Sequence, residues 1–280
     1  MRTYFFVSDI HSFYTSLMTA LHKAGFDVNN QEHTLVVLGD VFDRGKETLE
    51  VFKFLKSLPK DRLILVRGNH ELLYSDLLKK RFPESYDFSN GTVRTFCQIA
   101  GFDEELLSMS YWFKRSYIEN LDIVELSEKP LEYWQQIKET VAMSDVTKWV
   151  QSNEWINYYE TPHYICVHSF IPLQERLIDF YHYETIGYRE DWKNATQTEW
   201  EDAMWGCPWS KAKEGWNKTG KTIMCGHWHT SDFFNHLTRQ FKTQHQNPIF
   251  KSKKYKLIGL DACTALTKKI NVLVLREDEL

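Results

Sequence analysis

The sequence predicts an α/β fold in which parallel strands alternate with helices, and two observations support this prediction. The first 80 of the 280 residues alternate between short apolar runs and segments with helical spacing. Such an alternation is typical of a parallel sheet with crossover helices. Polar residues of the types that bind metal ions also stand directly after five apolar runs, and α/β sheets place their sites at the carboxyl ends of strands. We therefore expect a functional site along one edge of the sheet.

The first three strands and the helices that follow them can be assigned from their apolar pattern. The predicted strands cover residues 3–8, 34–39 and 62–67, and the predicted helices cover residues 15–24, 47–58 and 71–81. In the first helix the apolar residues Leu17, Met18 and Leu21 recur at helical spacing. Gly25 ends this helix, and Pro59 stops the second one.

The middle of the chain has a different composition, rich in Trp, Tyr, Phe, Glu and Leu. Helical periodicity around residues 104–112 and 131–150 indicates that residues 83–161 are a mostly helical insertion, which we expect to cover one side of the site. A second insertion, residues 172–218, contains several tryptophans. Aromatic residues at this density are more often core residues than stacking partners for a substrate.

Two further apolar runs close the chain, at residues 255–260 and 270–275, with a break near Cys263. No internal repeat and no low-complexity linker divides the sequence. Because this length fits one large α/β domain, we expect residues 1–280 to form a single domain that carries the two insertions.

Composition excludes several classes of partner and setting. The 34 basic and 38 acidic residues give a net charge of −4, which offers no global attraction to nucleic acid or to an anionic membrane. No apolar run approaches the roughly 20 residues that span a bilayer, and the apolar start is too short for a signal peptide. The five cysteines include no CxxC pair, so we expect a reducing, cytoplasmic setting.

Seven metal-capable side chains follow the apolar runs. They are Asp9, His11, Asp40, Asn69, His168, His227 and His229. Two cations about 3.5–4 Å apart can bind a phosphate and activate a water, and they need a bridging carboxylate. Asp40 is the best candidate for the bridge, since a second strand-end carboxylate, Asp9, is available to complete the first metal.

The remaining ligands divide between two divalent ions. We expect Asp9, His11 and one histidine of the 226–229 turn on the first metal, and Asn69, His168 and the other histidine of that turn on the second. Mixed Asp, Asn and His donors without thiolates suit Mn²⁺, the most favoured ion, and also Fe or Zn²⁺, better than Ca²⁺. Each motif alone has an ordinary explanation as a turn, a helix cap or a polar strand end. Five in series are hard to attribute to coincidence.

Neighbouring charged residues fit hydrolysis of a phosphoester. Arg44 can fork to two phosphate oxygens. His70 can protonate the leaving alkoxide as a general acid, and Asp43 can orient it and keep it cationic. Arg44, Asn69 and His70 are the expected substrate contacts. Glu71 is expected to brace Arg44 or Arg67.

These motifs resemble the calcineurin-like metallophosphoesterases, and within them the phosphoprotein phosphatase family of serine/threonine phosphatases with its bacterial and phage-type members. The resemblance rests on Asp9-x-His11, on residues 39–45 (Gly-Asp-x-x-Asp-Arg-Gly), on residues 67–71 (Arg-Gly-Asn-His-Glu), on Val167-His168 and on Gly226-His227. It implies a four-layer α-β-β-α sandwich with the metals at one sheet edge. It also implies direct attack by metal-bound hydroxide, His70 as the acid and Arg44 as the phosphate clamp. In this family pattern His227 belongs to the second metal and His229 to the first.

Two positions depart from the family pattern. The small pair that follows the fourth-motif histidine is Ser169-Phe170 here, which is expected to narrow the pocket. The second phosphate-binding arginine has no clear match, and the lysines available to replace it are Lys211, Lys213, Lys218 and Lys221. A lysine binds phosphate as a point charge and not as a fork.

The sequence leaves three functions open. The first is a serine/threonine protein phosphatase that hydrolyses phosphomonoesters, with a phosphorylated protein or a small phosphoester as its partner. The second is a dinucleoside polyphosphate hydrolase, which shares the same motifs. The third is a non-catalytic scaffold on a relic metal site, which the complete ligand set disfavours. The basic stretch 239–256 is a solvated loop by default and a docking surface for an acidic substrate otherwise.

Overall fold

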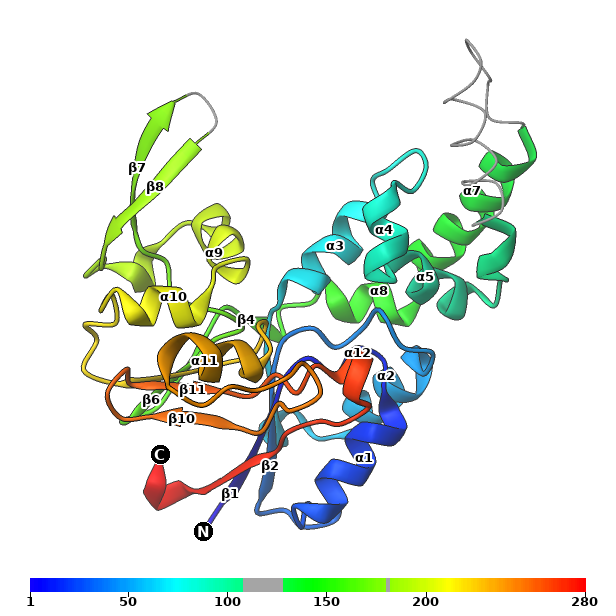
Figure 1. The fold of residues 1–280 in the computed structure, drawn as a ribbon. Helices are drawn as coiled ribbons and strands as arrows, with labels where there is room; N and C mark the ends of the chain where they lie inside the picture. The colour runs from blue at the N-terminus through cyan, green and yellow to red at the C-terminus, as the bar shows by residue number, and fades with distance from the viewer. Residues whose placement is uncertain (108–127, 180–181) are drawn as a thin grey trace.

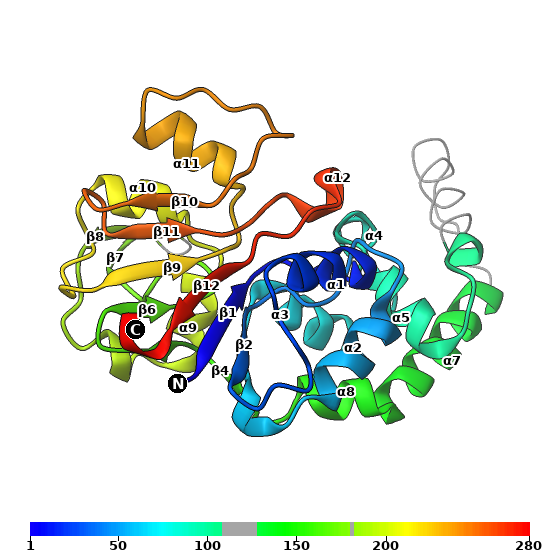
Figure 2. The same cartoon turned by 90° about the horizontal axis from the view of Figure 1, so that it is seen from below.

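The computed structural model describes residues 1–107, 128–179 and 182–280. Two five-stranded sheets face each other, and helices cover their outer faces (Figures 1 and 2). The first sheet has the order β12 (Leu273–Arg276), β1 (Thr3–Val7), β2 (His33–Leu38), β3 (Leu63–Val66) and β4 (Trp155–Ile156). The second has the order β10 (Phe250–Ser252), β11 (Leu257–Gly259), β9 (Thr222–Cys225), β6 (Tyr164–Cys166) and β5 (Tyr159–Glu160). The predicted four-layer sandwich is confirmed.

Side-chain alternation along the strands creates the layers. On β1, Phe6 points into the apolar layer between the two sheets, whereas Phe5 and Val7 join the cluster under the first set of helices. On β9, Met224 lies in the layer between the sheets and Ile223 packs under the second set. Successive side chains of a strand point to opposite faces, so a sheet that is buried on both faces needs apolar residues at nearly every position.

The helices divide into two groups by the sheet that they cover. The first sheet is covered by α1 (Tyr14–Lys23), α2 (Thr48–Ser57), α3 (Asn69–Leu77), α4 (Ser85–Asn90), α5 (Thr92–Ala100), α7 (Glu128–Met143) and α8 (Asp145–Val150). The second sheet is covered by α9 (Gln197–Met204), α10 (Pro208–Lys213) and α11 (Thr230–Leu237). The other helical elements described are the short α12 (Thr264–Thr267) and three 3₁₀ turns (Lys60–Arg62, Trp192–Asn194 and Glu277–Glu279).

Strand register brings the polar strand ends together. β1, β2 and β3 are parallel, with Val7 opposite Val37 and Leu38 opposite Val66. β6, β9 and β11 are also parallel to one another. Because parallel strands end at the same edge, the residues that follow them in each sheet converge there.

Several elements differ from the sequence-based expectations. The third helix begins at Asn69 and ends at Leu77, earlier than predicted at both ends. The last strands are shorter than predicted, and β12 pairs antiparallel with β1. The hairpin of β7 (Gln174–Asp179) and β8 (His182–Gly187) was not predicted. Its strands belong to neither five-stranded sheet, and bulges interrupt their pairing. The run of apolar residues that marks a buried strand is therefore weak in this part of the sequence.

The two segments predicted as insertions hold elements of different kinds. Residues 83–161 contain α4, α5, α7 and α8 and, at their end, β4 and β5, which are edge strands of the two sheets. The predicted periodicity at 108–112 lies outside the described residues. Residues 172–218 contain the hairpin, α9 and α10. Within the described parts of the chain, no helix has the length and apolar character that crossing a membrane requires.

Candidate dinuclear metal site

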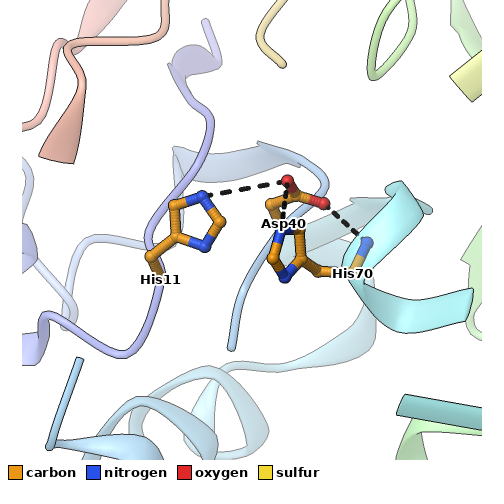
Figure 3. Close-up of side chains that lie close together, drawn as sticks. All are labelled: His11, Asp40 and His70. Atoms are coloured by element: carbon orange, nitrogen blue, oxygen red, sulfur yellow. Dashed lines mark hydrogen bonds and ion pairs between the residues drawn. The ribbon is translucent and has the colours of Figure 1, made fainter. Parts of the chain in front are cut away.

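Asp40, which follows β2, lies at the centre of the site. Its Oδ2 is 3.8 Å from Nε2 of His11 and 3.8 Å from Nε2 of His70 (Figure 3). Its Oδ1 is 3.3 Å from Nε2 of His168. The side chain is 2% exposed. The two oxygens of one buried carboxylate therefore face different groups of imidazoles.

Backbone carbonyls orient the histidines around Asp40. The Nδ1–H of His11 donates to the carbonyl of Phe42 at 3.0 Å, and the Nδ1–H of His168 donates to the carbonyl of Leu38 at 2.8 Å. Each bond leaves the Nε2 lone pair directed at the site, which is how metal-binding histidines are usually held.

The second group forms around His168. Its Nε2 is 2.8 Å from Oδ1 of Asn69 and 3.2 Å from Nδ1 of His227. These three donors together with Asp40 match the set expected for the second metal. Asp40, His168 and His227 each offer a ligand atom within 4.8 Å of the others.

Asp9 and His229 line the same cavity but belong to neither compact group of potential ligands. The carboxylate of Asp9 accepts the backbone N–H of His227 at 3.1 and 3.2 Å. Nε2 of His229 is 3.9 Å from Oδ2 of Asp261. Asp261 was not predicted as a site residue, although it stands two residues after a strand, which is the same signal that identified the others.

Six of the predicted site residues have a left-handed backbone. They are Asp9, His11, Asp40, Asp43, Arg44 and His227, with φ between 51° and 74°. This conformation costs about 1–3 kcal/mol for a residue with a side chain, and it persists where the surrounding structure imposes it. The loops after β1, β2 and β9 are therefore held in tight turns that direct these side chains into one cavity.

Glycines allow the strand ends to approach one another. A Cβ on Gly226 would lie 2.1 Å from Oδ2 of Asp9, and one on Gly39 would lie 2.5 Å from Nδ1 of His168. Neither separation is possible for real atoms, so the two sheets meet at the site only because these positions lack side chains.

The charges at this edge fit bound cations. Burial, followed by the charges of Asp261 and Asp40, raises the pKa of Asp9 well above its usual range. Burial lowers the pKa of His11 well below its usual range and that of His227 to about 3, so both imidazoles are neutral, as ligands must be. Surplus buried negative charge beside neutral imidazoles fits a positive ion. Among the described residues, no cysteine sulfur belongs to either group.

His70 is held by a carboxylate on the side away from Asp40. Its Nδ1 is 2.7 Å from Oδ2 of Asp43, which is fully buried. Burial alone would lower the pKa of His70, but the charge of Asp40 and the hydrogen bond of Asp43 raise it above its usual value. Nη2 of Arg44 is 3.5 Å from Nε2 of His70. The two cationic groups thus face a common space.

Helix α5 contributes residues that sequence reasoning missed. The hydroxyls of Thr92 and Thr95 donate to the two oxygens of Asp43, each at 2.7 Å. Arg94 donates to the backbone carbonyl of Arg44 at 2.8 Å. No local motif marks these threonines, because their role depends on where α5 packs.

The expectation for Glu71 is wrong. Its carboxylate accepts the backbone N–H groups of Gly68, Asp40 and Val41 at 2.8–3.1 Å and contacts neither of the arginines it was expected to brace. Glu71 stands at the third position of α3, where a glutamate commonly reaches back to the start of its helix. It joins the loop before α3 to the loop after β2.

The expectations for the pocket wall are also wrong. The metal-site cavity, of about 110 Å³, is lined by neither Ser169 nor Phe170. Ser169 donates to the carbonyl of Gly206 at 2.7 Å, and Phe170 packs in the apolar cluster beneath the second set of helices. Both side chains therefore contact the part of the chain around α9 and α10 and not the cavity.

None of the four candidate lysines lines this cavity. Lys211 donates to the hydroxyl of Thr185 at 2.6 Å, and Lys221 pairs with Glu160 at 2.8 Å. Lys213 and Lys218 are exposed at the surface. Their spacing from the last histidine motif did not indicate which way their side chains point, since two of them, Lys211 and Lys213, lie on α10 and the other two follow it.

Comparison with known proteins identifies the family of the chain. Residues 3–231 match the family model described as calcineurin-like phosphoesterase. The chain belongs to this family. A solved structure of a cold-active protein tyrosine phosphatase superposes with a TM-score of 0.54 at 13% identity, covering 99% of this chain and 75% of that one. At this identity the likeness concerns the fold alone.

The curated relatives match over a shorter stretch. A symmetrical bis(5'-nucleosyl)-tetraphosphatase of Buchnera aphidicola is 44% identical over 72 residues, which are 26% of this chain and 25% of that protein. An asymmetrical bis(5'-nucleosyl)-tetraphosphatase of Bacillus velezensis is 35% identical over 74 residues, which are 24% of this chain and 30% of that protein. The matches thus span only about a quarter to a third of the length of these relatives.

Proposed function

We propose that this protein hydrolyses phosphoric esters or anhydrides at a site for two divalent cations, and that nucleoside polyphosphates are its substrate class. The observation that carries the proposal is the position of Asp40. Its Oδ2 faces His11 and its Oδ1 faces His168. One carboxylate with a ligand group on each oxygen is the arrangement that a bridged pair of metals needs.

The chain supplies ligands for both cations. Asp9, His11 and His229 would serve the first, Asn69, His168 and His227 the second, and Asp40 both. Bound metals would neutralise phosphate oxygens and lower the pKa of a water. The nitrogen and oxygen donors suit Mn²⁺, and also Fe or Zn²⁺.

Two further residues would act on the substrate directly. Arg44 would bind phosphate oxygens, since its Nε is buried with no hydrogen-bond partner among the described residues and its guanidinium lines the cavity. His70, cationic and held by Asp43, would give its Nε2 proton to the leaving oxygen. Asn69 and His70 complete the expected substrate contacts.

The nucleotide class is favoured by the relatives. The matches at 35–44% identity are named tetraphosphatases of dinucleosides. This supports the second of the functions left open by the sequence over the first. We also propose a reducing, cytoplasmic setting, because all five cysteines are unpaired.

A panel of substrates on metal-stripped protein tests the proposal. Protein treated with EDTA is reloaded with Mn²⁺, Zn²⁺ or Mg²⁺ and given diadenosine tetraphosphate, a phosphoserine peptide, p-nitrophenyl phosphate and its bis-ester. We expect metal-dependent turnover with diadenosine tetraphosphate as the best substrate. Silence on every substrate, with two metals bound per chain, would favour the non-catalytic scaffold.

A serine/threonine protein phosphatase remains the second candidate, favoured by the pair of His70 and Asp43. An alkoxide leaving group has a high pKa and needs a proton donor, whereas a nucleotide leaving group needs one less. An oriented, cationic imidazole is therefore of most use on an alkyl phosphate. Preference for the phosphoserine peptide in the same panel would replace the nucleotide proposal with this one.

A further inference from the structure

Trp205 differs from the other tryptophans of the described chain in its exposure. Five tryptophans are 6% exposed or less (Trp134, Trp149, Trp155, Trp192 and Trp200), whereas Trp205 is 50% exposed. A large aromatic side chain left half in water gains little stability from its own surface. Burial of apolar surface therefore does not explain the position of Trp205.

Trp205 lines the metal-site cavity. It is the residue that caps the end of α9, and its ring centroid is 6.3 Å from that of His227, with the two planes perpendicular. The backbone carbonyl of Trp205 also accepts a hydrogen bond from the ring of His227. The exposed indole thus borders the place where the phosphate is expected to bind.

The segment that carries Trp205 is fixed to the site. The backbone N–H of Trp205 donates to the carbonyl of Asp202 and that of Gly206 to the carbonyl of Ala203, both at 3.1 Å. The hydroxyl of Ser169 holds the carbonyl of Gly206 at 2.7 Å, and Ser169 directly follows His168. Because this segment is already fixed, a flat ligand can stack on its indole with little further loss of the protein's conformational freedom.

We propose that Trp205 is a stacking platform for the nucleobase of the substrate. This inference rests on the proposed function and adds a named contact for the base. A base offers a flat π face whatever its identity, so stacking would bring nucleosides to the site without strong selection among them. The phosphates would then reach Arg44 and the metal ligands across the same cavity.

The test is a binding measurement on metal-loaded protein, which does not require turnover. Calorimetry gives the Kd of adenosine 5'-monophosphate and of ribose 5-phosphate, which has the same phosphate and sugar but no base. Stacking of one base should make the nucleotide bind roughly 5- to 150-fold more tightly. Trp205→Ala should remove most of this ratio, and Trp205→Phe should keep much of it.

Phe241→Ala is the matched control, since Phe241 is 79% exposed and does not line the cavity. It should leave the ratio unchanged. Equal affinities of the two ligands for the unaltered protein would overturn the proposal. So would a nucleotide advantage that survives Trp205→Ala, or a variant that weakens both ligands equally, which would indicate a role through His227 alone.

The outcome separates this inference from the proposed function. A Trp205-dependent advantage for the nucleotide without turnover of diadenosine tetraphosphate would keep the stacking site and reject nucleotide hydrolysis. Turnover of diadenosine tetraphosphate without any advantage from the base would support nucleotide hydrolysis and reject the stacking site. A peptide substrate that lost as much affinity as the nucleotide in Trp205→Ala would reject the base as the specific occupant.

Discussion

Asp40 takes part in three kinds of contact, and each one joins a different segment to the site. Its carboxylate faces the imidazoles of His11 and His168, and its Oδ1 accepts the backbone N–H of His70 at 3.0 Å. Its backbone N–H donates to Glu71. The residue therefore couples the ends of β1, β2 and β6 to the start of α3, and in the proposed site its charge would be shared by both cations.

Asp40→Asn should abolish turnover. The amide keeps the shape of the side chain but removes the charge that two cations share, so we expect a loss in kcat of about 10³-fold or more, at least that of removing a preorganised electrostatic group. The measurement is turnover of the best substrate together with bound metal per chain. Asp76→Asn, on the exposed side of α3, is the control and should have no effect. Full activity in Asp40→Asn would rule out Asp40 as the bridging carboxylate.

His70→Asn should slow substrates according to their leaving group. General acid catalysis contributes roughly 10²–10⁴-fold, and p-nitrophenolate needs little of it. We expect a loss of at least about 10²-fold on an alkyl phosphate and a much smaller one on p-nitrophenyl phosphate. His22→Asn, at an exposed position of α1, is the control. Equal losses on both substrates would mean that His70 is a ligand or a binding residue and not the acid.

Helix α5 contributes to the site indirectly, through its contacts with Asp43. It belongs to the segment predicted as a cap over the site, and it packs against α2 and α3 and presents Thr92 and Thr95 to Asp43. The backbone N–H of Asp43 also donates to Thr95 at 3.0 Å. Asp43 is thus fixed on both oxygens and on its backbone before it meets His70.

Thr95→Val should weaken both the fold and the acid. It removes one hydrogen bond to a buried carboxylate, which is worth about 1.5–3 kcal/mol when one partner is charged, and one hydrogen bond from the backbone N–H of Asp43. We expect the free energy of unfolding to fall by about that amount and the activity on an alkyl phosphate to fall more than that on p-nitrophenyl phosphate. Denaturant unfolding and the activity ratio measure the two effects. Thr140→Val, exposed on α7, should change neither. An unchanged activity ratio would mean that Thr95 contributes to the stability of the fold and not to the general acid.

At the scale of the whole molecule, the two sheets bring acidic groups together at one buried edge. Asp9 comes from the first sheet and Asp261 from the second, and burial, with repulsion from Asp40, raises the pKa of each of them. Glu71 is buried nearby, and its pKa is raised for the same reasons. The fold alone therefore concentrates negative charge that cations would relieve.

Metal binding should therefore stabilise the protein. A ligand at a hundredfold excess over its Kd adds about 2.7 kcal/mol per site, which corresponds to roughly 5–10 °C in Tm for a protein of this size class. Calorimetric melting of EDTA-treated protein with and without Mn²⁺ measures the shift. Asp40→Asn should reduce it strongly. No shift in the unaltered protein would contradict the charge argument, whatever the activity.

Local sequence predicted the first three strands and their helices to within a few residues, because apolar period and strand-end chemistry are both local signals. Asp43 and His70 belong to two neighbouring strand-end motifs, and in the structure Oδ2 of Asp43 is 2.7 Å from Nδ1 of His70. The roles assigned to Glu71 and to the lysines after residue 210 failed for one reason. Spacing along the chain places a residue on an element but says nothing of which neighbour it faces.

The division of residues 1–280 into one domain with two insertions stays a prediction, as do the roles of the individual site residues. Residues 83–161 and 172–218 gave the least reliable expectations. Among their described tryptophans, Trp134, Trp149, Trp155, Trp192 and Trp200 are buried, as expected, but Trp205 is not. Composition cannot separate one exposed indole from several buried ones, since all share the same side-chain chemistry.

Which residue types stand at the ends of the apolar strands can be read from the sequence: donors of the kinds that metals bind, with an arginine, a histidine and an aspartate beside them. How these side chains are arranged depends on the packing of the fold. Asp40 meets His168 across 128 residues of chain because two sheets pack face to face, and Gly39 and Gly226 permit the approach. The participation of Asp261, Thr92, Thr95 and Trp205 depends on packing between elements, which no local pattern records.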